Sequence, residues 1–186
     1  MKRFFVFFAL FTALFLTCAA AQQNSAAQQA AAELTFTFTR QSGAASNQFA
    51  VWIEDSSGRY IKTLYATRYT ANGGWRRRDT SIPVWVRQSG LAGMTNAQID
   101  TLTGATPRTG SLTYTWDGTD SRGAIVPNGD YIIFLEGTLR WANQVIYRAP
   151  IRLGQGPASP EVNVEYTGDP GAERVMIGGV TVRTLR

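Results

Sequence analysis

The stretch Leu34-Thr-Phe-Thr-Phe-Thr-Arg40 alternates strictly between apolar and polar residues. Successive side chains of a β-strand point to opposite faces, so this pattern predicts a strand with one buried face and one wet face. The same alternation returns in Ser111-Leu-Thr-Tyr-Thr-Trp116. These two stretches indicate a domain built mainly of β-sheet.

Further strands are predicted by short runs of β-branched and aromatic residues between turn residues. Phe49–Glu54 and Arg59–Tyr65 flank the turn Asp55-Ser-Ser-Gly58 and should pair as a hairpin. Other strands are expected at Asp130–Gly137, Val145–Leu153 and Glu161–Tyr166, with a last hairpin of Val175–Ile177 and Val180–Val182 across Gly178-Gly179. Seven or more short strands with frequent turn residues predict a β-sandwich.

The segment from Ala66 to Gly110 breaks the strand pattern. Short helices are expected at Val84–Ser89 and Asn96–Leu102, and Thr95 should cap the second helix through its side-chain oxygen. Long connections inside a compact domain are uncommon and are often functional. We therefore predict a loop and short-helix insertion that carries the functional site.

The N-terminus has the order of a secretory signal peptide. Met1-Lys-Arg3 is basic, Phe4–Leu16 is apolar, and Ala19-Ala-Ala21 offers small residues for cleavage. The apolar run is shorter than the about 20 residues that cross a bilayer. We predict cleavage after Ala21 and export to the periplasm. A lipid anchor at Cys18 is the weaker alternative, because Phe15-Leu-Thr17 fits a lipoprotein signal poorly.

Composition excludes several kinds of site. The chain has no histidine, and its single cysteine lies in the predicted signal peptide. A Ser-His-Asp triad, a histidine general base and a disulfide within the exported chain therefore cannot be built. The formal charge of +5 falls to +3 when Lys2 and Arg3 leave with the signal. This mild excess on an exported protein gives no reason to expect nucleic-acid binding.

The remaining chain is long enough for one ordinary domain. We assign residues 1–21 to the signal peptide, 22–33 to a flexible linker rich in Ala, Gln and Ser, 34–153 to the β-sandwich, and 154–186 to a linker with the C-terminal hairpin.

A heptad near the end of the insertion, Asp100-Thr-Leu-Thr-Gly-Ala-Thr106, fits the pattern Asp-x-x-(Ser/Thr)-Gly-Ala-(Ser/Thr). The pattern resembles the acceptor site of extracytoplasmic flavin transferases, which move the FMN part of FAD onto the last hydroxyl. The resemblance implies covalent FMN on Thr106 and an extracytoplasmic electron carrier. It also implies a flavin transferase and a membrane redox protein as partners.

The residue types in the heptad suit that chemistry. Thr106 supplies a hydroxyl nucleophile, which the transferase would activate. Gly104 should permit a tight turn and close approach of a diphosphate, and Ala105 adds little bulk. Thr103 should shape the turn through a local side-chain to backbone hydrogen bond. The resemblance implies that Asp100 is read by the transferase or helps to place metal and phosphate. The alternative is a helix end capped by Gly104.

A second candidate site is formed by Trp75, Arg76, Arg77 and Arg78. An arginine could meet the FMN phosphate or stabilise the reduced ring, while Trp75 or Trp85 stacks on it. The alternative is a solvated loop with surface ion pairs. Trp52, Trp116 and Trp141 lie in strand patterns and are expected in the core.

Two stretches resemble known families. Trp116-Asp-Gly-Thr-Asp120 with Val126-Pro-Asn-Gly-Asp-Tyr131 is similar to the immunoglobulin-like module of flagellar hook-capping proteins. A wider span, about 34–153, resembles a family of predicted periplasmic proteins, domain-of-unknown-function family 2271. The matching stretches are Phe49-Ala-Val-Trp-Ile-Glu-Asp55, Lys62-Thr-Leu64, Gly73-Gly-Trp-Arg-Arg-Arg78, the heptad, Trp116–Asp120 and Glu136-Gly-Thr-Leu-Arg-Trp141.

Two other functions stay open from the sequence. The chain could be a non-redox periplasmic binding or assembly module, in which the heptad is only a cap and turn. An exported hydrolase has weaker support, since its carboxylates would be chosen only by elimination among Glu54, Asp55, Asp117 and Glu136. Asp117 and Asp120 lack the spacing of an EF-hand and predict a tight turn, not a calcium site.

Overall fold

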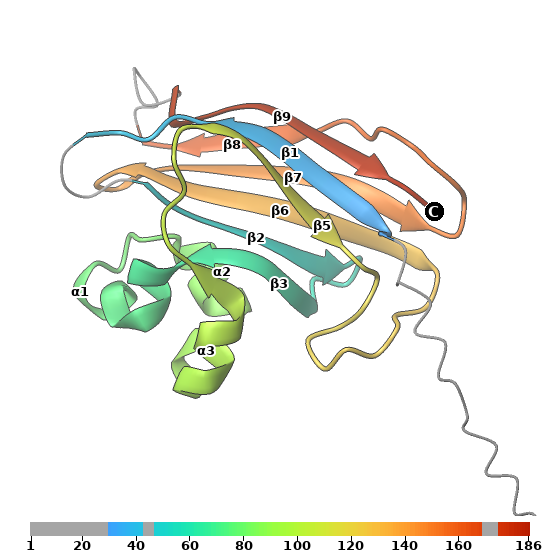
Figure 1. Ribbon diagram of the computed structural model, residues 1–186, viewed down its shortest axis with the longest axis horizontal. Helices are drawn as coiled ribbons and strands as arrows, with labels where there is room; N and C mark the ends of the chain where they lie inside the picture. Colours follow the sequence, from blue (N-terminus) through green and yellow to red (C-terminus); the bar gives the residue numbers. More distant parts are fainter. Residues whose placement is uncertain (1–29, 43–46, 169–174) are drawn as a thin grey trace, which may run out of the picture.

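A computed structural model describes residues 30–42, 47–168 and 175–186 as two facing β-sheets (Figure 1). The three-stranded sheet has the order β5 (Gly110–Trp116), β1 (Ala32–Phe38), β9 (Ile177–Thr184). The six-stranded sheet has the order β4 (Thr103–Gly104), β3 (Tyr60–Thr67), β2 (Gln48–Asp55), β6 (Gly129–Arg140), β7 (Asn143–Leu153), β8 (Asn163–Thr167). The predicted mainly-β sandwich is confirmed, and its immunoglobulin-like character stays a prediction.

The alternation in β1 sets which side chains fill the space between the sheets. Leu34, Phe36 and Phe38 are buried there, while the intervening threonines face outward. Strand β2 is buried on both faces, which explains its continuous apolar run. Val51 faces the core between the sheets, whereas Trp52 belongs to a second core on the outer face of the six-stranded sheet.

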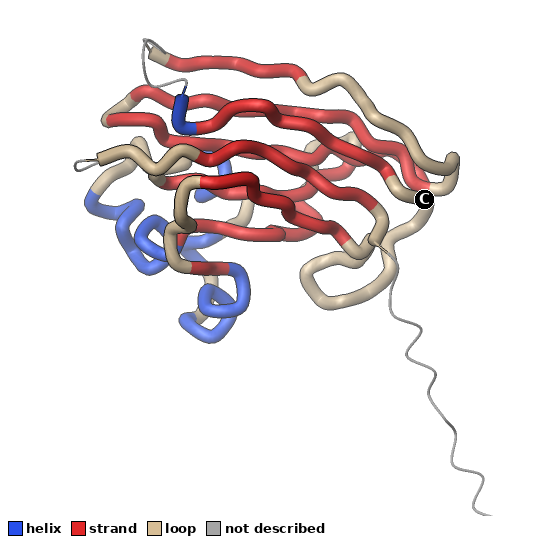
Figure 2. The backbone as a smooth tube through the Cα atoms, turned by 45° about the horizontal axis from the view of Figure 1, so that its top comes forward, coloured by secondary structure: helices blue, strands red, loops and turns tan. Residues whose placement is uncertain are grey.

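The insertion between β3 and β5 forms that second core. It consists of the π-helical turn η1 (Thr70–Gly74), α1 (Trp75–Arg77), α2 (Pro83–Gln88), the 3₁₀ turn η2 (Leu91–Gly93), α3 (Asn96–Leu102) and the short strand β4. Figure 2 shows all the helices of the insertion gathered beside one end of the sandwich. The second core contains Trp85 of α2 from the insertion. From the sheet it contains the stacked rings of Trp52 and Phe134, whose centroids lie 4.8 Å apart. The two predicted helices are confirmed.

The predicted C-terminal hairpin is wrong. Gly178 and Gly179 lie inside the single strand β9, which pairs along β1. The β1–β9 register shifts between Thr35 and Thr37, and Gly179 has a φ of 60° at this bulge. A bulge and a two-residue turn both favour glycine with positive φ. The Gly178-Gly179 dipeptide alone therefore could not distinguish a bulge within one strand from a turn between two strands.

Two other expectations are corrected by burial. Trp141 was expected in the core, but it is 63% exposed with a φ of 50° in the turn between β6 and β7. The linker was expected to run to residue 33, but Ala32 and Glu33 already belong to β1, and Ala31 is fully buried. The predicted signal peptide and Cys18 lie outside the described residues.

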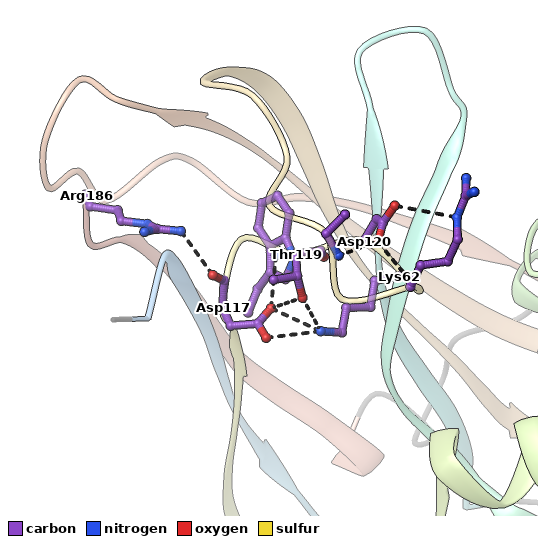
Figure 3. A network of polar contacts seen from close by, with 8 residues as sticks. Lys62, Asp117, Thr119, Asp120 and Arg186 are labelled. Atoms are coloured by element: carbon purple, nitrogen blue, oxygen red, sulfur yellow. Dashed lines mark hydrogen bonds and ion pairs between the residues drawn. The ribbon is translucent and has the colours of Figure 1, made fainter. Parts of the chain in front are cut away.

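The connection from β5 to β6 is held by the turn that the two aspartates predict (Figure 3). Asp117 accepts hydrogen bonds from the backbone and side chain of Thr119, and Asp120 accepts from two backbone N–H groups of its own turn. Lys62 of β3 donates to both Asp117 oxygens, at 3.0 and 3.2 Å, and to Thr119. Arg186 donates to the carbonyl of Asp117, so the C-terminus is tied to the same turn.

Candidate functional site

The first half of the Asp100–Thr106 heptad lies on helix α3, which has a defined start. Thr95 and Gln98 form a capping box, in which each side chain bonds to the backbone of the other. The expected cap at Thr95 is therefore confirmed. Ile99 packs this helix onto the second core, and the neighbouring Asp100 is exposed.

The second half of the heptad leaves the helix as an extended strand. Thr103 and Gly104 pair in parallel with Ala66 and Thr67 at the edge of the six-stranded sheet. A helix end capped by a left-handed Gly104 is wrong, because the last turn is followed by Thr103 at φ −115° and ψ 149° and Gly104 is extended. The heptad therefore joins a helix directly to a sheet edge.

Tyr65 explains the glycine of the heptad. A β-carbon at Gly104 would lie 2.6 Å from Cε2 of Tyr65, so any larger residue would collide with the ring. The Tyr65 hydroxyl donates to the carbonyl of Ala105 at 2.7 Å. Burial raises the pKa of Tyr65 to about 12, so this donor keeps its proton. The ring also stacks on Phe49, which connects the heptad to the core of the sandwich.

The two hydroxyls of the heptad have different surroundings. Thr106 is half-buried in the irregular segment that leads to β5. The Thr103 hydroxyl is buried and has no hydrogen-bond partner among the described residues, so the expected local bond from Thr103 to the backbone is wrong. A buried hydroxyl without a partner is costly, by about 1–3 kcal/mol, unless a ligand or water satisfies it.

A pocket of about 410 Å³, called here the aromatic pocket, brings the two predicted sites together. Trp75, Arg76 and Asp100 line it, with Leu91 and Met94 among its apolar walls. The guanidinium carbon of Arg76 lies 5.0 Å from the centroid of the Trp75 ring. The structure therefore places an aromatic ring, a cation and the first residue of the heptad around one space. Thr106 is not among the residues that line it.

The other residues of the tryptophan–arginine run point elsewhere. Arg78 donates to the carbonyl of Trp141 at 2.6 Å, and burial lowers the pKa of its guanidinium. Arg77 lines a neighbouring cleft. Trp85 is fully buried and its indole donates to Thr63, so stacking of Trp85 on a ligand is excluded and Trp75 is left.

Sequence reasoning missed the residue that anchors the insertion. Glu136 of β6 is almost fully buried and accepts hydrogen bonds from the N–H groups of Val84 and Trp85, at 3.1 and 2.8 Å. Burial raises the pKa of Glu136 to about 7, although these two N–H groups lower it. The available signal was a carboxylate inside the apolar run of a strand, since glutamate is rarely buried without partners.

The same sheet face holds the start of α2 in a strained conformation. Ile82, the residue before Pro83, has a φ of 42°, which is unusual for a β-branched side chain. Its N–H donates to the Thr138 hydroxyl at 2.8 Å. Thr138 and Glu136 thus fix the first turn of α2 onto the sheet beneath it.

These features define the class as a two-sheet β-sandwich with a helical insertion on one outer face. Residues 29–171 match the family described as predicted periplasmic protein (DUF2271), and the chain belongs to this family. No curated protein and no solved structure matches the chain. Within the described residues, no helix is both long and apolar enough to cross a membrane.

Proposed function

We propose that this protein is an extracytoplasmic electron carrier with FMN attached to Thr106 by a phosphoester bond. The heptad Asp100–Thr106 is the observation that carries the proposal. In the attachment reaction, the Thr106 hydroxyl oxygen bonds to the phosphorus on the FMN side of FAD. The bond between the two phosphates breaks, AMP leaves and the hydroxyl proton is released. A flavin transferase catalyses this step, so the protein is its substrate.

The residues around the heptad fit an FMN group. Thr106 is half-exposed on an irregular segment, where a transferase can reach it. Trp75 offers a ring for stacking, and the Arg76 guanidinium would favour negative charge on a reduced ring. The partnerless Thr103 hydroxyl is a further polar group that a ligand could satisfy. When bound, FMN supplies reversible uptake and release of electrons.

Intact mass of the denatured protein tests the attachment. The protein is co-expressed with a flavin transferase in the periplasm, beside Thr106→Ala and the matched control Thr109→Ala. We expect a gain of one FMN less one water on the wild type and on Thr109→Ala, and no gain on Thr106→Ala. An unmodified wild type, with the transferase active on another acceptor, would refute the proposal.

The roles of Trp75 and Arg76 have separate measurements. If Trp75 stacks on the ring, it quenches flavin fluorescence, so Trp75→Ala should be brighter at equal FMN content. If the Arg76 cation stabilises the reduced ring, Arg76→Gln should shift the reduction potential to more negative values. Unchanged fluorescence and potential in fully loaded variants would place the ring outside the aromatic pocket.

The second candidate is a non-redox binding module. It is favoured by the presence of arginines in the insertion that make no ion pair with any described residue. This function predicts that Thr106→Ala changes neither colour nor ligand binding. The mass measurement above therefore separates the two functions.

A further inference from the structure

The positive charge of this protein is concentrated in the insertion. Residues 66–110 contain six arginines and two aspartates, a net charge of +4. The rest of residues 22–186 contains ten basic and eleven acidic residues, a net charge of −1. The insertion is described in full, and none of its arginines forms an ion pair with a described residue.

Three of these arginines meet around one concave space. Arg68, Arg76 and Arg77 line a cleft of about 550 Å³, together with Tyr69 and the turn Asn72-Gly73-Gly74. No carboxylate lines this cleft, which we call the arginine cleft. Like charges gathered around one concave space favour the binding of an anion between them.

The backbone of the cleft has a conformation typical of anion sites. Asn72 has φ −83° and ψ 36°, and Gly73 has φ 92° and ψ −1°. A non-helical turn residue followed by a left-handed glycine is a turn conformation of the kind that points successive N–H groups toward one concave side and forms a nest for anions. A β-carbon on Gly73 would meet nothing within 4 Å, so its φ, not a lack of space, is what requires glycine there.

The backbone turn that lines the cleft is held in place before any ligand binds. Gly74 is buried, and a β-carbon there would collide with the carbonyl and the ring of Tyr69. The backbone of Arg78 closes back onto the Gly74 carbonyl with a 2.9 Å hydrogen bond. A preformed turn loses little backbone freedom on binding, which favours recognition of a small ligand.

We infer that the arginine cleft is a binding site for a phosphate-bearing ligand, separate from FMN attachment at Thr106. Guanidinium groups bind phosphate oxygens through paired, charge-assisted hydrogen bonds, and a nest adds backbone donors. Tyr69, which is 49% exposed, supplies a ring at the rim. The shared chemistry is a phosphate group, which a soluble ligand or a lipid headgroup can carry.

The test uses the full exported chain produced without a transferase. Inorganic pyrophosphate is titrated and followed by the backbone amide shifts of the protein. We expect saturable one-to-one binding with shifts centred on residues 68–77. Arg68→Gln and Arg77→Gln should each weaken binding roughly tenfold or more. Arg108→Gln removes the same charge from the same insertion outside the cleft, and should bind as the wild type does.

A variant that keeps every charge separates a built site from general attraction. Gly73→Ala strains the nest at a φ that alanine rarely adopts, and should also weaken pyrophosphate binding. Equal loss in Arg68→Gln and Arg108→Gln, or full binding by Gly73→Ala, would overturn the proposal.

A second arm identifies the source of the phosphate. Vesicles of phosphatidylglycerol are compared with neutral phosphatidylcholine vesicles in a flotation assay. Binding to anionic vesicles that Arg68→Gln abolishes and Arg108→Gln retains would assign the site to lipid headgroups. Pyrophosphate binding without vesicle binding would assign it to a soluble ligand, and absence of both would overturn the inference.

Discussion

Six ion pairs join charged side chains of the sandwich, whereas none of the arginines in the 66–110 insertion forms an ion pair with a described residue. All six ion pairs among the described residues lie outside the insertion, for example Lys62 with Asp117 and Arg152 with Asp130. The sandwich packs long strands of its two sheets around a core between them, while the insertion is made of short helical turns docked on one outer face.

This difference assigns the two regions different structural roles. A rigid sheet provides the surface, and Glu136, Thr138 and Tyr65 reach from it to hold the insertion. The insertion can then present the half-buried Thr106, the proposed FMN acceptor, and arginines that form no ion pair with a described residue. Such groups would be unfavourable inside a sheet. The following predictions test how far the two regions are independent.

The largest expected effect is on the core between the two sheets of the sandwich. Phe49 is fully buried and its ring lies 5.1 Å from that of Tyr65, which holds the heptad. Phe49→Ala should lower the free energy of unfolding by about 3–5 kcal/mol in urea denaturation. Leu91→Ala, a buried truncation within the insertion, should instead increase hydrogen exchange in the insertion alone. If Leu91→Ala increased hydrogen exchange in the sandwich by the same factor, the two regions would unfold together.

The next effect concerns the anchor of α2. The pKa of Glu136 is raised from 4.5 to about 7, so the folded state binds its proton more tightly than the unfolded state. The contribution of protonated Glu136 to the free energy of unfolding is fully present below pH 4.5. It is lost as pH rises through 7, by roughly 3 kcal/mol. Urea denaturation at pH 4.5 and 8 should show this loss in the wild type and not in Glu136→Gln. Parallel pH profiles would contradict the assignment.

A smaller effect is expected at the turn that ties β3 to the β5–β6 connection. Lys62 donates three hydrogen bonds there, but both ion-pair partners are partly exposed. Lys62→Met should therefore lower the free energy of unfolding by about 1–2 kcal/mol, and the loss should shrink in 1 M salt, where the Debye length falls to about 3 Å. The control is the more exposed ion pair of Arg152 with Asp130. Arg152→Met should change the free energy of unfolding little.

The smallest effect is local to the helix that carries Asp100. Thr95→Ala removes one half of the capping box, which should lower helix stability by about 1 kcal/mol or less. Hydrogen exchange should quicken at α3, with the sandwich strands unchanged. Thr95→Ser keeps the oxygen and should restore the wild-type rate. Faster exchange throughout the protein would mean that α3 is not a separate unit.

Local patterns were sufficient for several elements. The alternation at Leu34–Arg40 predicted β1, and Thr95 with Gln98 predicted the start of α3 because a cap depends on residues three positions apart. The Gly178-Gly179 prediction failed since a bulge and a turn use the same glycine conformation. The prediction that Trp141 lies in the core was wrong because the strand ends just before it, and the turn that follows exposes its side chain.

Neighbouring residues along the chain were enough to predict the mainly β class, the position of the insertion and the heptad with Thr106. Contacts across the fold were needed to show that Trp75, Arg76 and Asp100 share one pocket, and that three arginines share a cleft. They were also needed to show that Glu136 anchors a helix 51 residues earlier in the chain. Such contacts depend on which sheet face each side chain meets, and this is fixed by strand pairing and burial over long separations along the chain.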